Sequence, residues 1–132
     1  MTTTPNALEH TVALPLPKIL GGLTAAYSVA VLVSPKVLAG PTELAPGGKV
    51  TRGVAALSRG VAARDLASGL AMVLAPTPQA QRTAIAVRVL SDLGDTVVFG
   101  TSLPSKSARR KAAAVGILWG GLCAASALTL ED

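Results

Sequence analysis

The sequence predicts an all-α protein: an integral membrane four-helix bundle with antiparallel, up-down-up-down topology. Half of the 132 residues are apolar and only 14% are charged. The mean hydropathy of +0.53 is higher than a soluble domain of this length normally shows. Proline and glycine separate four segments of helical length. We therefore expect a polar tail over residues 1–17 and a single four-helix transmembrane domain over residues 18–132.

The four expected spans cover residues 18–38, 53–75, 83–103 and 111–130. Almost the whole of the first and last spans lacks Asp, Glu, Lys, Arg and His. About 20 such residues, at about 1.5 Å each, cross a hydrocarbon core about 30 Å thick. A soluble bundle would normally carry charge along the outer face of every helix, so these two segments favour a membrane.

Basic residues predict the orientation of the bundle. The loop after the first span carries three lysines and arginines and the loop after the third carries four, whereas the other side has only Lys18 and Arg82. By the positive-inside rule, loops 36–52 and 104–111 are cytoplasmic and both termini lie outside the cell membrane. The excess of basic over acidic residues therefore reflects how the chain is oriented in the membrane. With one Trp, one Tyr and one Phe, the chain has no stacking platform, and we expect no nucleic-acid partner.

Charged residues interrupt the two middle spans: Arg59, Arg64, Asp65, Arg88, Asp92 and Asp95. Ionisable side chains inside a membrane are costly and by default indicate a functional site. At about 1.5 Å per residue, Arg64 and Asp65 lie about 16–18 Å into their span. Asp92 and Asp95 lie about 14–18 Å into theirs, so the two sets meet near the bilayer midplane.

Helical phase, at about 100° per residue, sorts these charges onto faces. The third span has one stripe of Arg88, Asp92, Asp95, Phe99 and Ser102. The second span has a stripe of Ser58, Val61, Arg64, Asp65, Ser68 and Met72. Arg59 lies about half a turn of phase from that stripe, so we separate it from the site. It either faces another helix or extends toward the cytoplasmic headgroups.

The candidate catalytic residues are the remaining five charges: Asp65, Asp92, Asp95, Arg64 and Arg88. Three carboxylates beside two guanidinium groups are hard to sustain in a low dielectric, so we expect one carboxyl to hold a proton. Asp92 and Asp95, one turn apart, suit an acid/base pair, and arginine can hold a carboxylate or stabilise an oxyanion. The candidate substrate-binding residues are Ser68, Met72 and Phe99.

We expect neither a cofactor nor a metal. His10 and Cys123 are the only residues of their types and lie in different segments, so zinc and haem lack ligands. Arginines beside the aspartates argue against a dedicated cation site. Helices should approach one another closely at five glycines: Gly21, Gly22, Gly116, Gly120 and Gly121.

Two runs of sequence carry a resemblance to a known family. RGVAARDLASGL from Arg59 to Leu70 and RVLSDLGD from Arg88 to Asp95 resemble the small four-helix membrane proteins catalogued as domain of unknown function 4267. The chain is more distantly similar to DoxX-like proteins. The resemblance covers about residues 19–130. It implies the fold and the importance of the five clustered charges, but no established reaction.

The first function class is a membrane-embedded enzyme that acts on a lipophilic small molecule from the bilayer. Its acid/base chemistry would be epoxide opening, cyclisation, hydration or isomerisation, without a metal. In that version one aspartate activates water or a substrate hydroxyl, arginine orients it, and the second aspartate protonates the leaving oxygen. An Asp-Arg-Asp set resembles the one used by limonene-type epoxide hydrolases, which are soluble and have an unrelated fold. This likeness concerns chemistry alone.

Two alternatives stay open. A proton-coupled transporter would use the aspartates to exchange protons with a cationic substrate, and a chain of this size would then need to assemble, for example as a homodimer. A membrane scaffold subunit would use the same charges only as ion pairs that fix helix register. The expected partners are thus the lipid bilayer and, for the first two classes, a small molecule.

Overall fold

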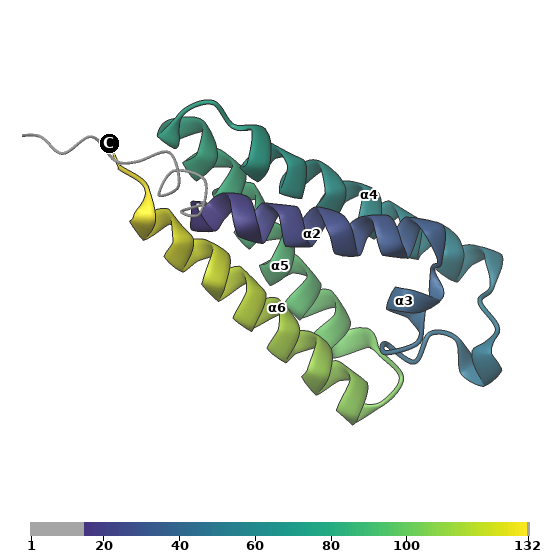
Figure 1. Cartoon of the computed structure of the whole chain (residues 1–132). Coiled ribbons are helices and arrows are strands. Elements are labelled where there is room, and N and C mark those ends of the chain that lie inside the picture. Colours follow the sequence, from purple (N-terminus) through teal and green to yellow (C-terminus); the bar gives the residue numbers. More distant parts are fainter. Residues whose placement is uncertain (1–14, 132) are drawn as a thin grey trace, which may run out of the picture.

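The computed structural model describes residues 15–131, and all regular structure within them is helical. Four long helices dominate: α2 (Leu16–Val33), α4 (Arg52–Leu74), α5 (Pro78–Ser102) and α6 (Lys106–Ser126) (Figure 1). Shorter turns are α3 (Lys36–Ala39), η1 (Pro46–Gly48) and η2 (Ala127–Thr129). The prediction of an all-helical chain with four long helices is confirmed. Most of the predicted tail, residues 1–14, lies outside the described residues.

Local sequence explains where the helices begin and end. The first expected span, residues 18–38, is divided into α2 and α3 because Ser34 precedes Pro35, and a residue before proline disfavours helical backbone. Helices α5 and α6 begin at Pro78 and Lys106, earlier than the expected residues 83 and 111. Their caps set these starts: the hydroxyls of Thr77 and Ser105 accept hydrogen bonds from backbone N–H groups three residues later.

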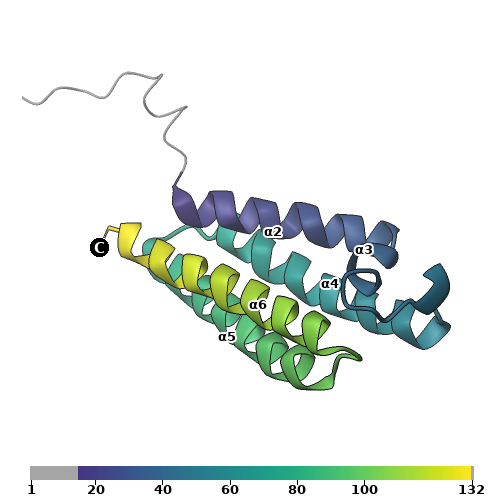
Figure 2. The ribbon, with the colours of Figure 1, turned by 90° about the horizontal axis from the view of Figure 1, so that it is seen from below.

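The helices pack as two pairs, α2 with α4 and α5 with α6, and the pairs meet mainly through α4 and α5. The pairs lie close together near the start of α2 and diverge toward the end that carries α3, as both views show (Figure 1 and Figure 2). A small apolar core joins them at the narrow end; it consists of Leu20, Met72, Ala84, Ile85 and Cys123. The wide end is covered by the segment around α3.

Glycines allow the backbones of α2 and α4 to touch. A Cβ on Gly21 would lie 2.6 Å from the carbonyl oxygen of Gly69, and a Cβ on Gly69 would lie 2.7 Å from that of Gly21. Each position excludes a larger side chain because backbone atoms of the other helix occupy the space. Gly22 faces open space, so the expected close approach at this residue is wrong.

In the second pair, glycines of α6 lie against α5. A Cβ on Gly120 would lie 3.1 Å from the Cβ of Asp92, and one on Gly116 would collide with the side chain of Thr96. The close approach at these two glycines is confirmed, whereas Gly121 faces open space. Helix α6 therefore packs against Asp92 on the side of this residue that faces away from α4.

The segment between α2 and α4 is connected to the turn between α5 and α6. The carboxylate of Glu43 accepts a hydrogen bond from the Ser105 hydroxyl, which also caps α6. Glu43 has a φ of 60°, in the left-handed region that non-glycine residues rarely adopt. The contact holds the α3 segment across the wide end of the molecule.

Two helical segments are long and apolar enough to cross a membrane by length and composition: Leu16–Val33 and Lys106–Thr129. Helices α4 and α5 have 23 and 25 residues but carry the charged residues described above. Large apolar side chains are exposed on all four long helices, among them Val33, Leu74, Leu90 and Leu118.

A glycine substitution tests the contact between α2 and α4. We expect Gly69→Ala to destabilise the fold by at least about 1–3 kcal/mol, because the new methyl group meets the backbone of α2. Gly60→Ala, on the same helix but facing open space, is the matched control and should be neutral or stabilising by up to about 1 kcal/mol. Unfolding of the purified variants in detergent measures both. Equal stabilities would contradict the close packing.

Candidate functional site

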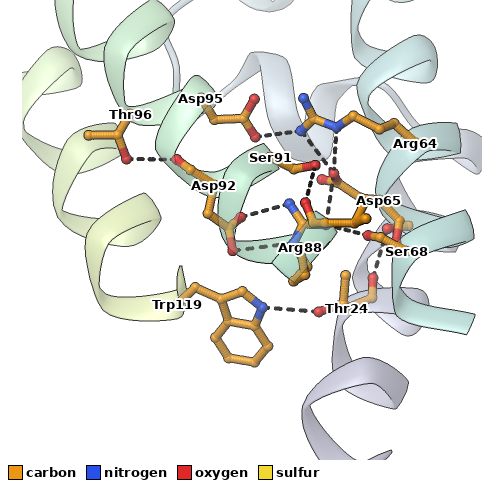
Figure 3. A network of polar contacts seen from close by, with 12 residues as sticks. Thr24, Arg64, Asp65, Ser68, Arg88, Ser91, Asp92, Asp95, Thr96 and Trp119 are labelled. Carbon is orange, nitrogen blue, oxygen red and sulfur yellow. Dashed lines mark hydrogen bonds and ion pairs between the residues drawn. The ribbon is translucent and has the colours of Figure 1, made fainter. Parts of the chain in front are cut away.

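All five clustered charges form one connected network between α4 and α5 (Figure 3). Arg64 and Asp65 come from α4, and Arg88, Asp92 and Asp95 come from α5. The network alternates in sign, from Asp92 through Arg88, Asp65 and Arg64 to Asp95. Helical phase and depth thus identified side chains that are close together in the fold.

Arg88 lies at the centre of the network and is almost completely buried, with 1% of its surface exposed. Its Nη2 lies 2.7 Å from Asp92 Oδ1 and its Nε donates to Asp92 Oδ2 at 3.2 Å. Its Nη1 lies 2.9 Å from Asp65 Oδ1 and donates to Ser68 Oγ at 2.9 Å. These contacts compensate the cost of burying the guanidinium group, and they connect the two helix pairs.

Arg64 forms the outer part of the network. Its Nη2 lies 2.6 Å from Asp95 Oδ2 and 2.9 Å from Asp65 Oδ1, so it bridges α4 and α5. Its side chain is 40% exposed, far more than that of Arg88. Since water screens an exposed ion pair, these contacts contribute less to stability than those of Arg88.

The three aspartates differ in how many of their oxygens are engaged. Both oxygens of Asp92 accept hydrogen bonds from Arg88. Asp65 engages Oδ1 alone, which contacts both arginines, and Asp95 engages Oδ2 alone. Within residues 15–131, Asp65 Oδ2 and Asp95 Oδ1 accept no hydrogen bond. These two oxygens can contact another molecule without displacing a protein contact.

A cavity of about 480 Å³ lies beside the network, between the two helix pairs. Most of its lining is apolar and comes from all four long helices, with Leu38 and Pro41 at the end covered by α3. Four charges of the network line it: Asp65, Arg88, Asp92 and Asp95. A volume of this size matches that of small-molecule sites, which are mainly apolar with a few polar groups.

The predicted binding residues occupy three different places. Phe99 lines the cavity. Ser68 is buried behind the network, where its hydroxyl accepts from Arg88 and donates to the carbonyl of Asp65. Met72 has no exposed surface and lies in the apolar core with Leu20, so the structure does not bring it to the cavity. Its long side chain fills the narrow end of the bundle instead.

Arg59 lies outside the network, as its helical phase indicates. Its Nε donates a hydrogen bond of 3.1 Å to the carbonyl oxygen of Leu32, near the end of α2. Of the two alternatives for this residue, the described contact is therefore the one with another helix.

Several cavity residues were not predicted from the sequence, among them Thr24, Lys111 and Trp119. Trp119 donates from Nε1 to Thr24 Oγ1 at 3.0 Å and so connects α6 with α2 beside the network (Figure 3). Lys111, Val115 and Trp119 all line the cavity and follow one another at intervals of four residues, the spacing of one face of a helix. That spacing could have indicated both residues, which lie within the expected span of residues 111–130.

Metal-ligating side chains do not converge in the described part of the chain. Between residues 15 and 131, no three His, Cys, Asp or Glu side chains are placed to hold one metal ion. Guanidinium groups separate the three aspartates of the network from one another.

The two arginines should differ strongly when replaced. We expect Arg88→Met to lower the free energy of unfolding by about 3–5 kcal/mol, because it leaves the buried Asp92 without its guanidinium partner and Asp65 with Arg64 alone. Arg64→Met is the matched control, with an expected loss of about 0–1 kcal/mol. Denaturant titration in detergent measures both changes. Equal losses would show that the network is not anchored on Arg88.

Comparisons with known protein families, with characterised proteins and with solved structures find no significant match to this chain. The function of the site is therefore inferred from its own geometry.

Proposed function

We propose that this chain is a membrane-embedded enzyme that performs acid/base chemistry on a lipophilic small molecule. The observation that carries the proposal is the mainly apolar cavity of about 480 Å³ whose wall holds four side chains of the Asp/Arg network. Apolar walls suit a lipophilic molecule, and charged groups on one wall suit a reaction at one polar atom of it. The resemblance to the domain of unknown function 4267 family stays a prediction and carries no reaction.

The membrane part of the proposal is supported by the outer surface. Exposed valines and leucines cover the middle and second half of α5: Val87, Leu90, Leu93, Val97 and Val98. Helix α6 carries a similar set: Val115, Ile117, Leu118 and Leu122. Soluble monomers rarely expose contiguous apolar patches of this kind, whereas lipid covers them without cost. We propose four antiparallel spans, with loops 36–52 and 104–111 on the cytoplasmic side.

The acid/base pair is best assigned to Asp65 and Asp95, with Arg64 between them. The sequence favoured Asp92 and Asp95, but Arg88 occupies both oxygens of Asp92. Asp65 and Asp95 each contact Arg64 through one oxygen and keep the other available beside the cavity. One carboxyl would accept a proton from water or a substrate hydroxyl while the other donates a proton to the leaving oxygen. Arg64 fixes their relative position.

Among the reactions open to such a pair, we favour the opening of a lipophilic epoxide, by water or by an internal hydroxyl. That reaction needs one proton removed from the nucleophile and one delivered to the ring oxygen, which two carboxyls can supply. Asp92, Arg88 and Ser68 support the pair by holding Asp65 through its Oδ1 side. A scaffold that uses these charges only as helix locks has no need of a cavity beside them.

Cysteine labelling tests the proposed topology. In a background with the buried Cys123 changed to alanine, we expect Gln79→Cys to react with a membrane-impermeant maleimide on intact cells. Ser107→Cys should react only after the membrane is opened, because its loop carries the basic residues. Labelling of both positions from the same side would contradict four spans in this orientation.

Turnover by purified protein in liposomes tests the chemistry. With a panel of lipophilic epoxides in ¹⁸O-labelled water, we expect ring-opened products, with label incorporated where water is the nucleophile. Asp95→Asn should lower the rate about 10²–10⁴-fold, because it removes one member of the acid/base pair while leaving the Asp92–Arg88 contacts in place. Mass spectrometry of extracted products measures the rates.

Glu131→Gln is the matched control. It removes an exposed carboxylate that lies after η2, outside the Asp/Arg network, and should leave the rate unchanged. Loss of folding in Asp95→Asn would support the scaffold alternative. Proton-linked uptake into the liposomes, abolished by the same substitution and without chemical conversion, would support the transporter instead.

A further inference from the structure

One charged side chain lines the cavity without belonging to the Asp/Arg network. Lys111 of α6 borders the cavity together with Ala108 and, from the α3 segment, Leu38 and Pro41. Among residues 15–131, it forms no ion pair with a carboxylate. The Asp/Arg contacts are complete without it, and Glu43, the acidic residue of the α3 segment, contacts Ser105 instead.

Contacts between α5 and α6 place Lys111 at a different depth from the network. Gly116 lies against Thr96 and Gly120 lies against Asp92, so the network is level with the middle of α6. From Lys111 to Trp119, which lies beside the network, α6 rises by about 12 Å at about 1.5 Å per residue. Both side chains line the same cavity, with apolar residues such as Val115 between them.

We propose that the cavity binds an amphipathic anion, a lipophilic molecule whose carboxylate or phosphate head group pairs with Lys111. Its apolar body lies along the cavity, and its far end reaches Asp65 and Asp95. This assignment rests on the proposed function and specifies its substrate class. Lys111 is exposed at the end of the cavity beside the α3 segment, so its ammonium group can pair with an anionic head group at the mouth while the apolar body lies against the apolar walls.

The single tryptophan of the chain makes the proposal measurable, because Trp119 lines the cavity. A bromine atom quenches indole fluorescence at short range. The probes are 11-bromoundecanoic acid, 11-bromoundecyl phosphate and 11-bromoundecanol, which share the apolar chain and differ in head group. Titration of purified protein in an uncharged detergent, without lipid, gives an apparent Kd for each probe.

We expect the acid, the phosphate or both to bind about 2–5-fold more tightly than the alcohol, as an ion pair with an exposed lysine predicts. The two anionic probes distinguish a carboxylate from a phosphate head group. Lys111→Met should abolish this preference and leave binding of the alcohol unchanged. Lys111→Arg should retain the preference. Lys106→Met is the matched control: it removes a lysine from the same end of α6 that does not line the cavity, and it should change nothing.

Two results would overturn the proposal in distinguishable ways. If the three probes quench Trp119 with equal Kd values, or if Lys111→Met does not alter the preference, the anion site is wrong while the cavity and the proposed enzyme remain. If no probe quenches Trp119 in any variant, the cavity does not take lipophilic molecules, and the proposed function fails together with the anion site.

Discussion

Arg88 connects the two helix pairs through charged contacts that are almost entirely shielded from water. Its guanidinium group contacts Asp65 and Ser68 on α4 and Asp92 on its own helix. The pairs meet mainly through α4 and α5, so these contacts lie where the two pairs are joined. Removing Arg88 would leave the buried carboxylate of Asp92 without its guanidinium partner. The relative position of the pairs, and with it the width of the space between them, therefore depends on this arginine.

The cavity exists because the two helix pairs pack closely at one end of the molecule and are separated at the other. At the narrow end, an apolar core around Met72 fills the space between them, and Gly21 and Gly69 bring the backbones of α2 and α4 into contact. Beyond the network the pairs diverge, and short side chains such as Ala108 and Ala112 do not fill the gap. The α3 segment covers it instead, held by Glu43 on Ser105. A rigid charged wall and a covered apolar space thus occur side by side.

Periodic and local signals in the sequence predicted a large part of this arrangement. Proline and glycine separated four helical segments, and the helical phase of Arg88, Asp92 and Asp95 placed them on one face. Arg59 was set apart by the same rule and does contact a different helix. The errors concern residues whose surroundings depend on more than one helix. Met72 shares the stripe of Asp65 but lies at the level of the apolar core, and helix starts were missed where caps extend a helix beyond its apolar stretch.

The sequence by itself determined the helical class, the four long elements and the identity of the five charges that meet, because helix periodicity and charge in an apolar context are local properties. Tertiary structure alone decided which oxygens of Asp65 and Asp95 stay available, and it gave Ser68 a structural place behind Arg88. It also brought Lys111 and Trp119 to one cavity. Those outcomes depend on the angle and depth at which the helix pairs meet. That geometry arises from contacts between residues far apart in the chain, which no local pattern encodes.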